Sequence, residues 1–184
     1  KIRVGKTVKD VYSDEELEQM RDCCKNTRDL AMIDILASTG IRVGELVQLN
    51  INDINLERRE FIVLGKGNKE RKAYFDARSK LHISQYINSR TDDNKALFVS
   101  LNNPHNRLTI RGIENMLQRV GQSLSETNVH PHKFRRTLAT KAIEKGMPIE
   151  QVQVLLGHSQ IDTTLRYAMV NQNNVKLSHQ KYIG

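Results

Sequence analysis

Apolar residues recur at helical spacing along most of the chain, and no other feature limits the possible folds as strongly. The most regular run places one apolar stripe along a single helix and comprises Ile113, Met116, Leu117, Val120 and Leu124. Weaker runs of the same period predict further helices around residues 17–24, 27–38, 81–87, 134–142 and 149–156. The chain is therefore predicted to be mainly helical.

Residues that typically begin and end helices stand at the borders of these runs. The sequence SDEE at residues 13–16 has the spacing of a capping box. Gly40 is predicted to end the second helix, after which a short helix that carries Arg42 begins. Gly157 is predicted to be the C-cap of the run before it, and Asp162 to begin a last helix through Val170.

The helical period is interrupted once, around Arg59. The sequence EFIVLGKGNKERKAYF predicts two strands, near Glu60–Leu64 and Arg71–Phe75, joined by a turn that contains glycine. The expected fold class is α+β and mainly α, a helical domain with a small antiparallel sheet. We expect residues 1–170 to form this domain and residues 171–184 to form a polar tail.

Charge narrows the choice of partner. The 184 residues contain 29 Lys and Arg against 21 Asp and Glu, a net charge of +8, and 38% of them are hydrophobic. A folded domain with this charge suggests an anionic partner, and nucleic acid is the first candidate. Composition alone leaves a merely basic protein without such a partner equally open.

Cysteine usage and hydropathy indicate where the protein works. Cys23 and Cys24 are adjacent, a spacing that rarely allows an ordinary disulfide, so we expect a reduced, intracellular chain. No run approaches the roughly 20 apolar residues of a membrane span, so no membrane partner is predicted.

Four separated segments place cationic or hydrogen-bonding groups beside predicted turns. Each group alone has a structural explanation, such as a hairpin tip for Lys66 or a helix cap for His158. Arg42 is less ordinary, because a cation at the start of a helix opposes the helix macrodipole. The complete set, in chain order, is Arg42, Lys66, His132, Arg135, His158 and Tyr167.

This set resembles the signature of the tyrosine recombinases, the family of the phage integrases and Xer-type recombinases. The matching segments are TGIRVGEL, GKGNKER, HKFR and LLGHS, with Tyr167 following nine residues after His158. Order, spacing and apolar neighbours match over about residues 13–170. One departure is Arg136, which stands where relatives often have histidine; it changes a neighbour of the site and is not expected to abolish it.

The resemblance implies an enzyme that cleaves and rejoins DNA strands without a metal ion or other cofactor. Tyr167 is expected to attack a DNA phosphorus, form a 3′-phosphotyrosine and release a 5′-hydroxyl, which retains the bond energy for rejoining. Integration or excision of a mobile element is the expected biological role.

The same resemblance assigns a role to each of the other five residues. Arg42 and Arg135 are expected to stabilise charge on the non-bridging phosphate oxygens, because guanidinium groups stay protonated and bind oxygens in pairs. Lys66 is expected to protonate the leaving 5′-oxygen. His132 is expected to donate or shuttle a proton, and His158 to donate a hydrogen bond to a non-bridging oxygen.

Further residues are predicted around this set. Glu45, one turn from Arg42, is expected to orient that arginine. Cations at predicted loops and helix starts are candidates for contacts with the DNA backbone, each with a solvated surface cation as the even alternative. These residues are Lys69, Arg71, Arg107 and Arg111, and Lys133 is a further candidate, expected to be a DNA-backbone contact or a turn residue.

Double-stranded DNA is the expected partner, and the resemblance implies a tetrameric synapse on DNA with a monomer in isolation. The family usually adds an N-terminal core-binding domain that this chain does not resemble, so we expect a catalytic domain from a longer protein. The tail at 171–184 is expected to dock on a neighbouring protomer, and a disordered tail is the open alternative. A cytoplasmic, nucleoid-associated bacterial location follows from the same resemblance.

Two other functions stay open from the sequence. A type IB topoisomerase also combines a tyrosine with arginine, lysine and histidine, but relaxes one duplex and does not join two. A DNA-binding regulator whose catalysis has lapsed belongs to a different class. The intact six-residue set is an argument against this last alternative, since a binding module has no use for Tyr167 near His158.

Overall fold

A computed structural model of the chain describes residues 11–65, 70–124, 129–157, 179–181 and 183. Within them the elements follow in the order α1 (Asp14–Asp22), α2 (Thr27–Thr39), α3 (Val43–Leu46), a 3₁₀ turn (Ile51–Asp53), β1 (Ile54–Asn55), β2 (Glu60–Leu64), β3 (Glu70–Tyr74), α4 (Ala77–Ser89), α5 (Ile110–Ser123), α6 (Pro131–Glu144) and α7 (Ile149–Leu156). This confirms the predicted fold class, a mainly helical domain with a small antiparallel sheet.

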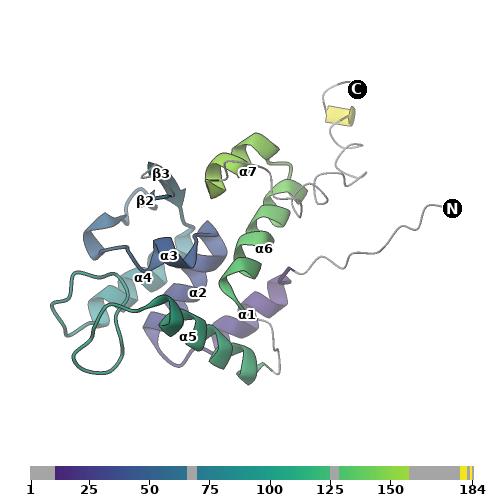
Figure 1. Cartoon of the computed structure of the whole chain (residues 1–184). Helices are drawn as coiled ribbons and strands as arrows, with labels where there is room; N and C mark the ends of the chain where they lie inside the picture. The colour runs from purple at the N-terminus through teal and green to yellow at the C-terminus, as the bar shows by residue number, and fades with distance from the viewer. Residues whose placement is uncertain (1–10, 66–69, 125–128, 158–178, 182, 184) are drawn as a thin grey trace.

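Helix α2 lies at the centre of the domain and packs most extensively against α4 and α6 (Figure 1). The residues from Ala31 to Leu36 are all buried, so this helix presents no solvent face over almost two turns. Sequence periodicity predicted one apolar face for this helix. The difference arises because a helix packed on several sides has buried residues all round, here including Asp34, and its apolar period is then weak.

The sheet has the strand order β1-β2-β3, and both pairs are antiparallel. Phe61 and Val63 of β2 are buried against the core, while Ile62 and Leu64 on the opposite face are exposed. In the β2–β3 register Val63 pairs with Arg71, which therefore lies on the core-facing side of the sheet. Strand β1 was not predicted, because two residues are too few to show an alternating pattern.

A second apolar cluster joins α6 to α7. It comprises Ala139, Ile143, Val152 and Leu156. Gly40, the left-handed C-cap of α2, lies against this junction, since a Cβ atom there would lie 2.9 Å from Leu156 Cδ2. The end of α2 is thus held close to the end of α7.

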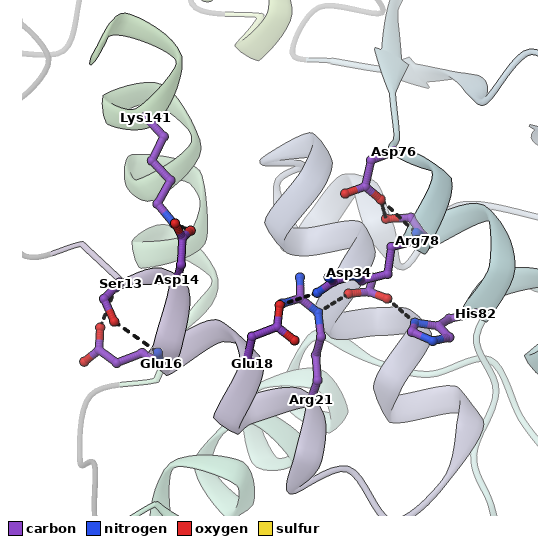
Figure 2. Close-up of polar contacts among 11 residues, drawn as sticks. Ser13, Asp14, Glu16, Glu18, Arg21, Asp34, Asp76, Arg78, His82 and Lys141 are labelled. Carbon is purple, nitrogen blue, oxygen red and sulfur yellow. Dashed lines mark hydrogen bonds and ion pairs between the residues drawn. The ribbon is translucent and has the colours of Figure 1, made fainter. Parts of the chain in front are cut away.

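Several predicted helix ends are confirmed. Ser13 and Glu16 form both hydrogen bonds of the capping box at the start of α1 (Figure 2). Gly157 adopts the left-handed conformation that ends α7. The predicted helix at 162–170 lies outside the described residues. Among the helices that are described, none combines the length and apolarity needed to cross a membrane.

Candidate active site

Arg42 stands at the N-cap of α3, directly after the turn that Gly40 allows. Its guanidinium Nη1 donates to Glu45 Oε1 at 3.1 Å, and its Nη2 donates to the Gly157 carbonyl at 3.3 Å. Its backbone N–H donates to Glu45 Oε2 at 3.0 Å. The carboxylate thus offsets the cation at this helix start, and 44% of the Arg42 side chain stays accessible.

Arg135 lies on α6 and is buried. Its Nη1 donates to the Gly40 carbonyl at 2.7 Å, and its Nη2 donates to the Leu156 carbonyl. Both carbonyls belong to helix ends, where the macrodipole is negative and favours a cation. Burial, and then repulsion from Arg42 and Arg71, lowers the pKa of Arg135 to about 9.

Glu45 is a buried carboxylate that contacts two arginines. Besides Arg42 it accepts a hydrogen bond from Arg71 Nη2, with 2.6 Å between that nitrogen and Oε2. Burial lowers the pKa of Arg71, while the charge of Glu45 acts in the opposite direction. Together with Arg135, whose charge interacts with that of Glu45, three guanidinium groups lie near one carboxylate, and the net charge of this cluster is positive.

Beside this cluster lies a cavity of about 660 Å³ between α3, the end of β2, α5 and the start of α6. Arg42, Glu45 and Arg135 line it together with His132, which is exposed on the first turn of α6. The remaining lining residues are Ile41, Val43, Gly44, Leu64, Gly65, Glu114, His130 and Pro131. A cavity with guanidinium groups on its wall is suited to bind an anion such as a phosphate diester.

The structure thus brings together three of the six predicted catalytic residues, namely Arg42, His132 and Arg135. The predicted residues Lys66, Lys69, His158 and Tyr167 lie outside the described residues. Their described neighbours Gly65 and Gly157 belong to the same site, one as part of the cavity wall and the other as a partner of Arg42.

The predicted DNA contacts have different surroundings. Arg107 donates hydrogen bonds to the carbonyls of Val47 and Leu49 and to the side chain of Asn50, so it connects two loops. Lys133 is buried, with its Nζ 4.4 Å from the centroid of the Tyr12 ring. Arg111 is exposed on the first turn of α5. DNA contact by each of these residues stays a prediction.

Sequence reasoning missed that Arg71 belongs to this cluster. A signal was present, since Arg71 alternates in step with Ala73 and Phe75, both of which are buried. An arginine in register with core residues has to find partners inside the protein.

The amino-acid sequence of the chain was compared with protein families and with known proteins. A family model described as the phage integrase family matches residues 10–174. Tyrosine recombinase XerC of Leptospira interrogans serogroup Icterohaemorrhagiae serovar Lai (strain 56601) is 37% identical over 158 residues, which cover 84% of this chain and 50% of that protein. XerC of Staphylococcus haemolyticus (strain JCSC1435) is 35% identical over 173 residues, which cover 90% and 58%. The chain thus spans between 50% and 58% of the length of these relatives.

Solved structures of a recombinase and of an integrase also superpose on the chain. The crystal structure of XerA recombinase superposes with a TM-score of 0.77 at 29% identity, covering 94% of this chain and 62% of that one. The Tn1549 transposon integrase, solved in complex with transposon right end DNA, has a TM-score of 0.77 at 21% identity, covering 95% and 66%. At this lower identity the likeness shows a shared fold.

Proposed function

The chain belongs to the phage integrase family, and we propose that it is the DNA-cleaving part of a site-specific tyrosine recombinase. Its substrate is a phosphodiester of double-stranded DNA. The protein cleaves one strand, keeps that strand covalently attached and then rejoins it to a partner strand. We place this reaction in the integration or excision of a mobile element, carried out by a tetramer assembled on DNA.

The observation that carries the proposal is the pair of arginines at the cavity. Arg42 and Arg135 come from different helices, yet both have a carbonyl partner at the end of α7, Gly157 and Leu156 respectively. Fixed guanidinium groups stabilise the charge that builds on phosphate oxygens in a phosphoryl-transfer transition state, because they need no reorganisation during the reaction. With Arg71, which contacts Glu45, the arginines outnumber Glu45 and Glu114, the two carboxylates that line the cavity, and this favours an anionic substrate.

The remaining roles are those expected from the family resemblance. Tyr167 attacks the phosphorus and forms a 3′-phosphotyrosine, and Lys66 protonates the leaving 5′-oxygen. His132, on the cavity wall, donates or shuttles a proton, and His158 donates a hydrogen bond to a non-bridging oxygen. One bond to phosphorus forms as another breaks, so rejoining needs no external energy source.

A nicked suicide duplex that carries the element's end tests this proposal. After cleavage the short 5′-hydroxyl fragment diffuses away, so the covalent protein–DNA complex accumulates and can be mapped by mass spectrometry. The wild-type chain is expected to form the complex through Tyr167, and Tyr167→Phe is expected to abolish it. Tyr74→Phe, at an exposed tyrosine of β3, is the matched control and is expected to retain it. A complex through another residue, or none, contradicts the proposal.

A further inference from the structure

Arg71 reaches the active site from the core-facing side of strand β3. Its side chain is only 10% exposed. The adjacent residue, Lys72, points to the other face, where its side chain is 51% exposed and pairs with Glu60. Two cations that are neighbours in the sequence therefore have opposite surroundings.

The guanidinium of Arg71 lies directly against the backbone at the end of α7. A Cβ atom on Gly157 would lie 2.4 Å from Arg71 Nε and 2.5 Å from its Cδ, distances that real Cβ atoms do not reach. Gly157 also has a φ of +63°, which disfavours other residues. The close packing of Arg71 is thus possible because residue 157 has no side chain.

Both partners that the structure gives to the Arg42 guanidinium are in turn contacted by Arg71. Glu45 accepts from Arg42 Nη1 at 3.1 Å and from Arg71 Nη2 at 2.6 Å. The Gly157 carbonyl accepts from Arg42 Nη2 at 3.3 Å, and the same glycine packs on Arg71. Arg71 consequently fixes the carboxylate and the backbone turn that together determine where Arg42 points.

Within the described part of the chain, the hydrogen bond from Arg71 to Glu45 satisfies only part of this buried guanidinium. Its Nε and Nη1 are buried and have no hydrogen-bond partner among the residues described by the structure. An arginine left partly unsatisfied in this way costs stability. A cost of this kind is expected at a site where arrangement matters for activity.

We propose that Arg71 is a positioning residue, which orients Arg42 for phosphate binding by holding Glu45 and the turn at Gly157. This inference rests on the proposed function and specifies how its site is assembled. It gives Arg71 a role different from the DNA-backbone contact predicted from the sequence, because a residue that acts through Arg42 changes the rate of cleavage and not the affinity for DNA.

The test compares Arg71→Gln with Lys72→Gln, which remove the same charge from adjacent positions of one strand. Single-turnover cleavage of the suicide duplex is measured at saturating DNA, together with the Kd for DNA and its salt dependence. Arg71→Gln is expected to lower the cleavage rate on the order of 100-fold, as small misplacements of reacting groups do. Its Kd and salt slope are expected to match those of Lys72→Gln, which keeps the wild-type rate.

A direct phosphate contact predicts a different result. Arg71→Gln would then weaken DNA binding beyond Lys72→Gln and reduce the salt slope by about 1. That result overturns the proposal, and so does a cleavage rate within about threefold of wild type, well short of the loss expected from misplacement. Rates are compared below the unfolding temperature of each variant, so that a general loss of stability does not imitate the effect.

A double-mutant cycle shows whether Arg71 acts through Glu45. Glu45→Gln, Arg71→Gln and the double variant are compared in the same cleavage assay. If the two residues act in series, the double variant is expected to cleave no more slowly than the slower single variant. If the two losses multiply, Arg71 acts independently of Glu45 and the proposal is wrong.

The same variants separate this inference from the proposed function. If the wild-type chain forms no covalent complex, the proposed function fails. The Arg71–Glu45 contact is then tested by urea unfolding of the same cycle. Coupling that changes the unfolding equilibrium constant by less than twofold contradicts the contact on which the inference depends. If the wild-type chain cleaves and Arg71→Gln cleaves equally fast, only the inference fails.

Discussion

Asp34 on α2 and Glu45 on α3 are both buried carboxylates with two side-chain partners each, yet their surroundings differ. Asp34 accepts from Arg21 Nε at 2.6 Å and lies within hydrogen-bond distance of His82 Nδ1 (Figure 2). Around it, Arg21 also pairs with Glu18, which pairs with Arg78. We call these five residues the Asp34 cluster. Two arginines there face two carboxylates, so its charges are balanced.

The cluster around Glu45 is not balanced. Arg42 and Arg71 share one carboxylate, Arg135 lies near them, and burial together with repulsion from the other two arginines lowers the pKa of Arg135. The Asp34 cluster connects α1, α2 and α4 and is complete without a ligand. The Glu45 cluster has cationic capacity left over, which an anion can use. Buried charge that is balanced indicates structure, and buried charge with an excess of one sign indicates a site.

The largest effect is expected for loss of the central carboxylate of the balanced cluster. Asp34→Ala leaves Arg21 and His82 without their buried partner, so the free energy of unfolding is expected to fall by about 3–5 kcal/mol. Urea unfolding measures this change. Asp93→Ala, at an exposed carboxylate, is the control and is expected to stay within about 0.5 kcal/mol of wild type. Equal losses in both variants would contradict a structural role for the Asp34 cluster.

Loss of an arginine from the Glu45 cluster is expected to reduce the cleavage rate strongly and to change stability little. Arg42→Gln removes a partly exposed guanidinium aimed at the cavity, so strand cleavage is expected to slow on the order of 100- to 1,000-fold. Its free energy of unfolding is expected to change by less than about 1 kcal/mol. Arg119→Gln, an exposed arginine of α5, is the control and keeps both values. A loss of stability as large as that of Asp34→Ala would remove the distinction between the two clusters.

Inorganic phosphate is expected to raise the free energy of unfolding by binding at the Glu45 cluster, and this effect is smaller. An ion that neutralises the excess charge binds only the folded state. At roughly ten times its Kd it is therefore expected to add about 1.4 kcal/mol to the free energy of unfolding. The increment is expected to persist in Arg119→Gln and to disappear in Arg42→Gln. An equal increment in both variants would indicate a general salt effect and no site.

The smallest effect is expected from acid, which weakens the ion pair between Arg90 and Asp92. The hydrogen bond from Arg90 lowers the pKa of Asp92 from 3.8 to about 2. The folded pKa is the lower one, so the ionised carboxylate stabilises the protein above pH 3.8, and this contribution disappears as the pH falls toward 2. Asp92→Asn is expected to flatten the stability profile between these values. An unchanged slope in that variant would show that Asp92 is not its source.

How much of this could be predicted from the sequence depends on how local each feature is. The capping box at Ser13 and the C-cap at Gly157 are decided by adjacent residues, and both predictions were confirmed. The weak period of α2 did not reveal burial on several sides, and the two residues of β1 carried no pattern.

The residues of the site likewise differ in how far the sequence could predict them. The chain segments that carry Arg42, His132 and Arg135 could be recognised one by one, and the structure brings these residues to one cavity. The partnership of Arg71 with Glu45 joins positions 26 residues apart, and that of Arg71 with Gly157 depends on how α7 packs on β3. Packing of this kind is a property of the tertiary structure and has no local signal.

The central claim is that the arginines at the cavity act on the charge of the DNA phosphate, and chemical complementation tests it most directly. In a methylphosphonate duplex one charged oxygen of the scissile phosphate is replaced by a neutral methyl group. Single-turnover cleavage by Arg42→Gln is measured on this duplex and on the natural one, each relative to wild type. We predict that the loss on the natural duplex, on the order of 100-fold or more, falls below about tenfold on the neutral one. An equal loss on both duplexes would contradict the claim.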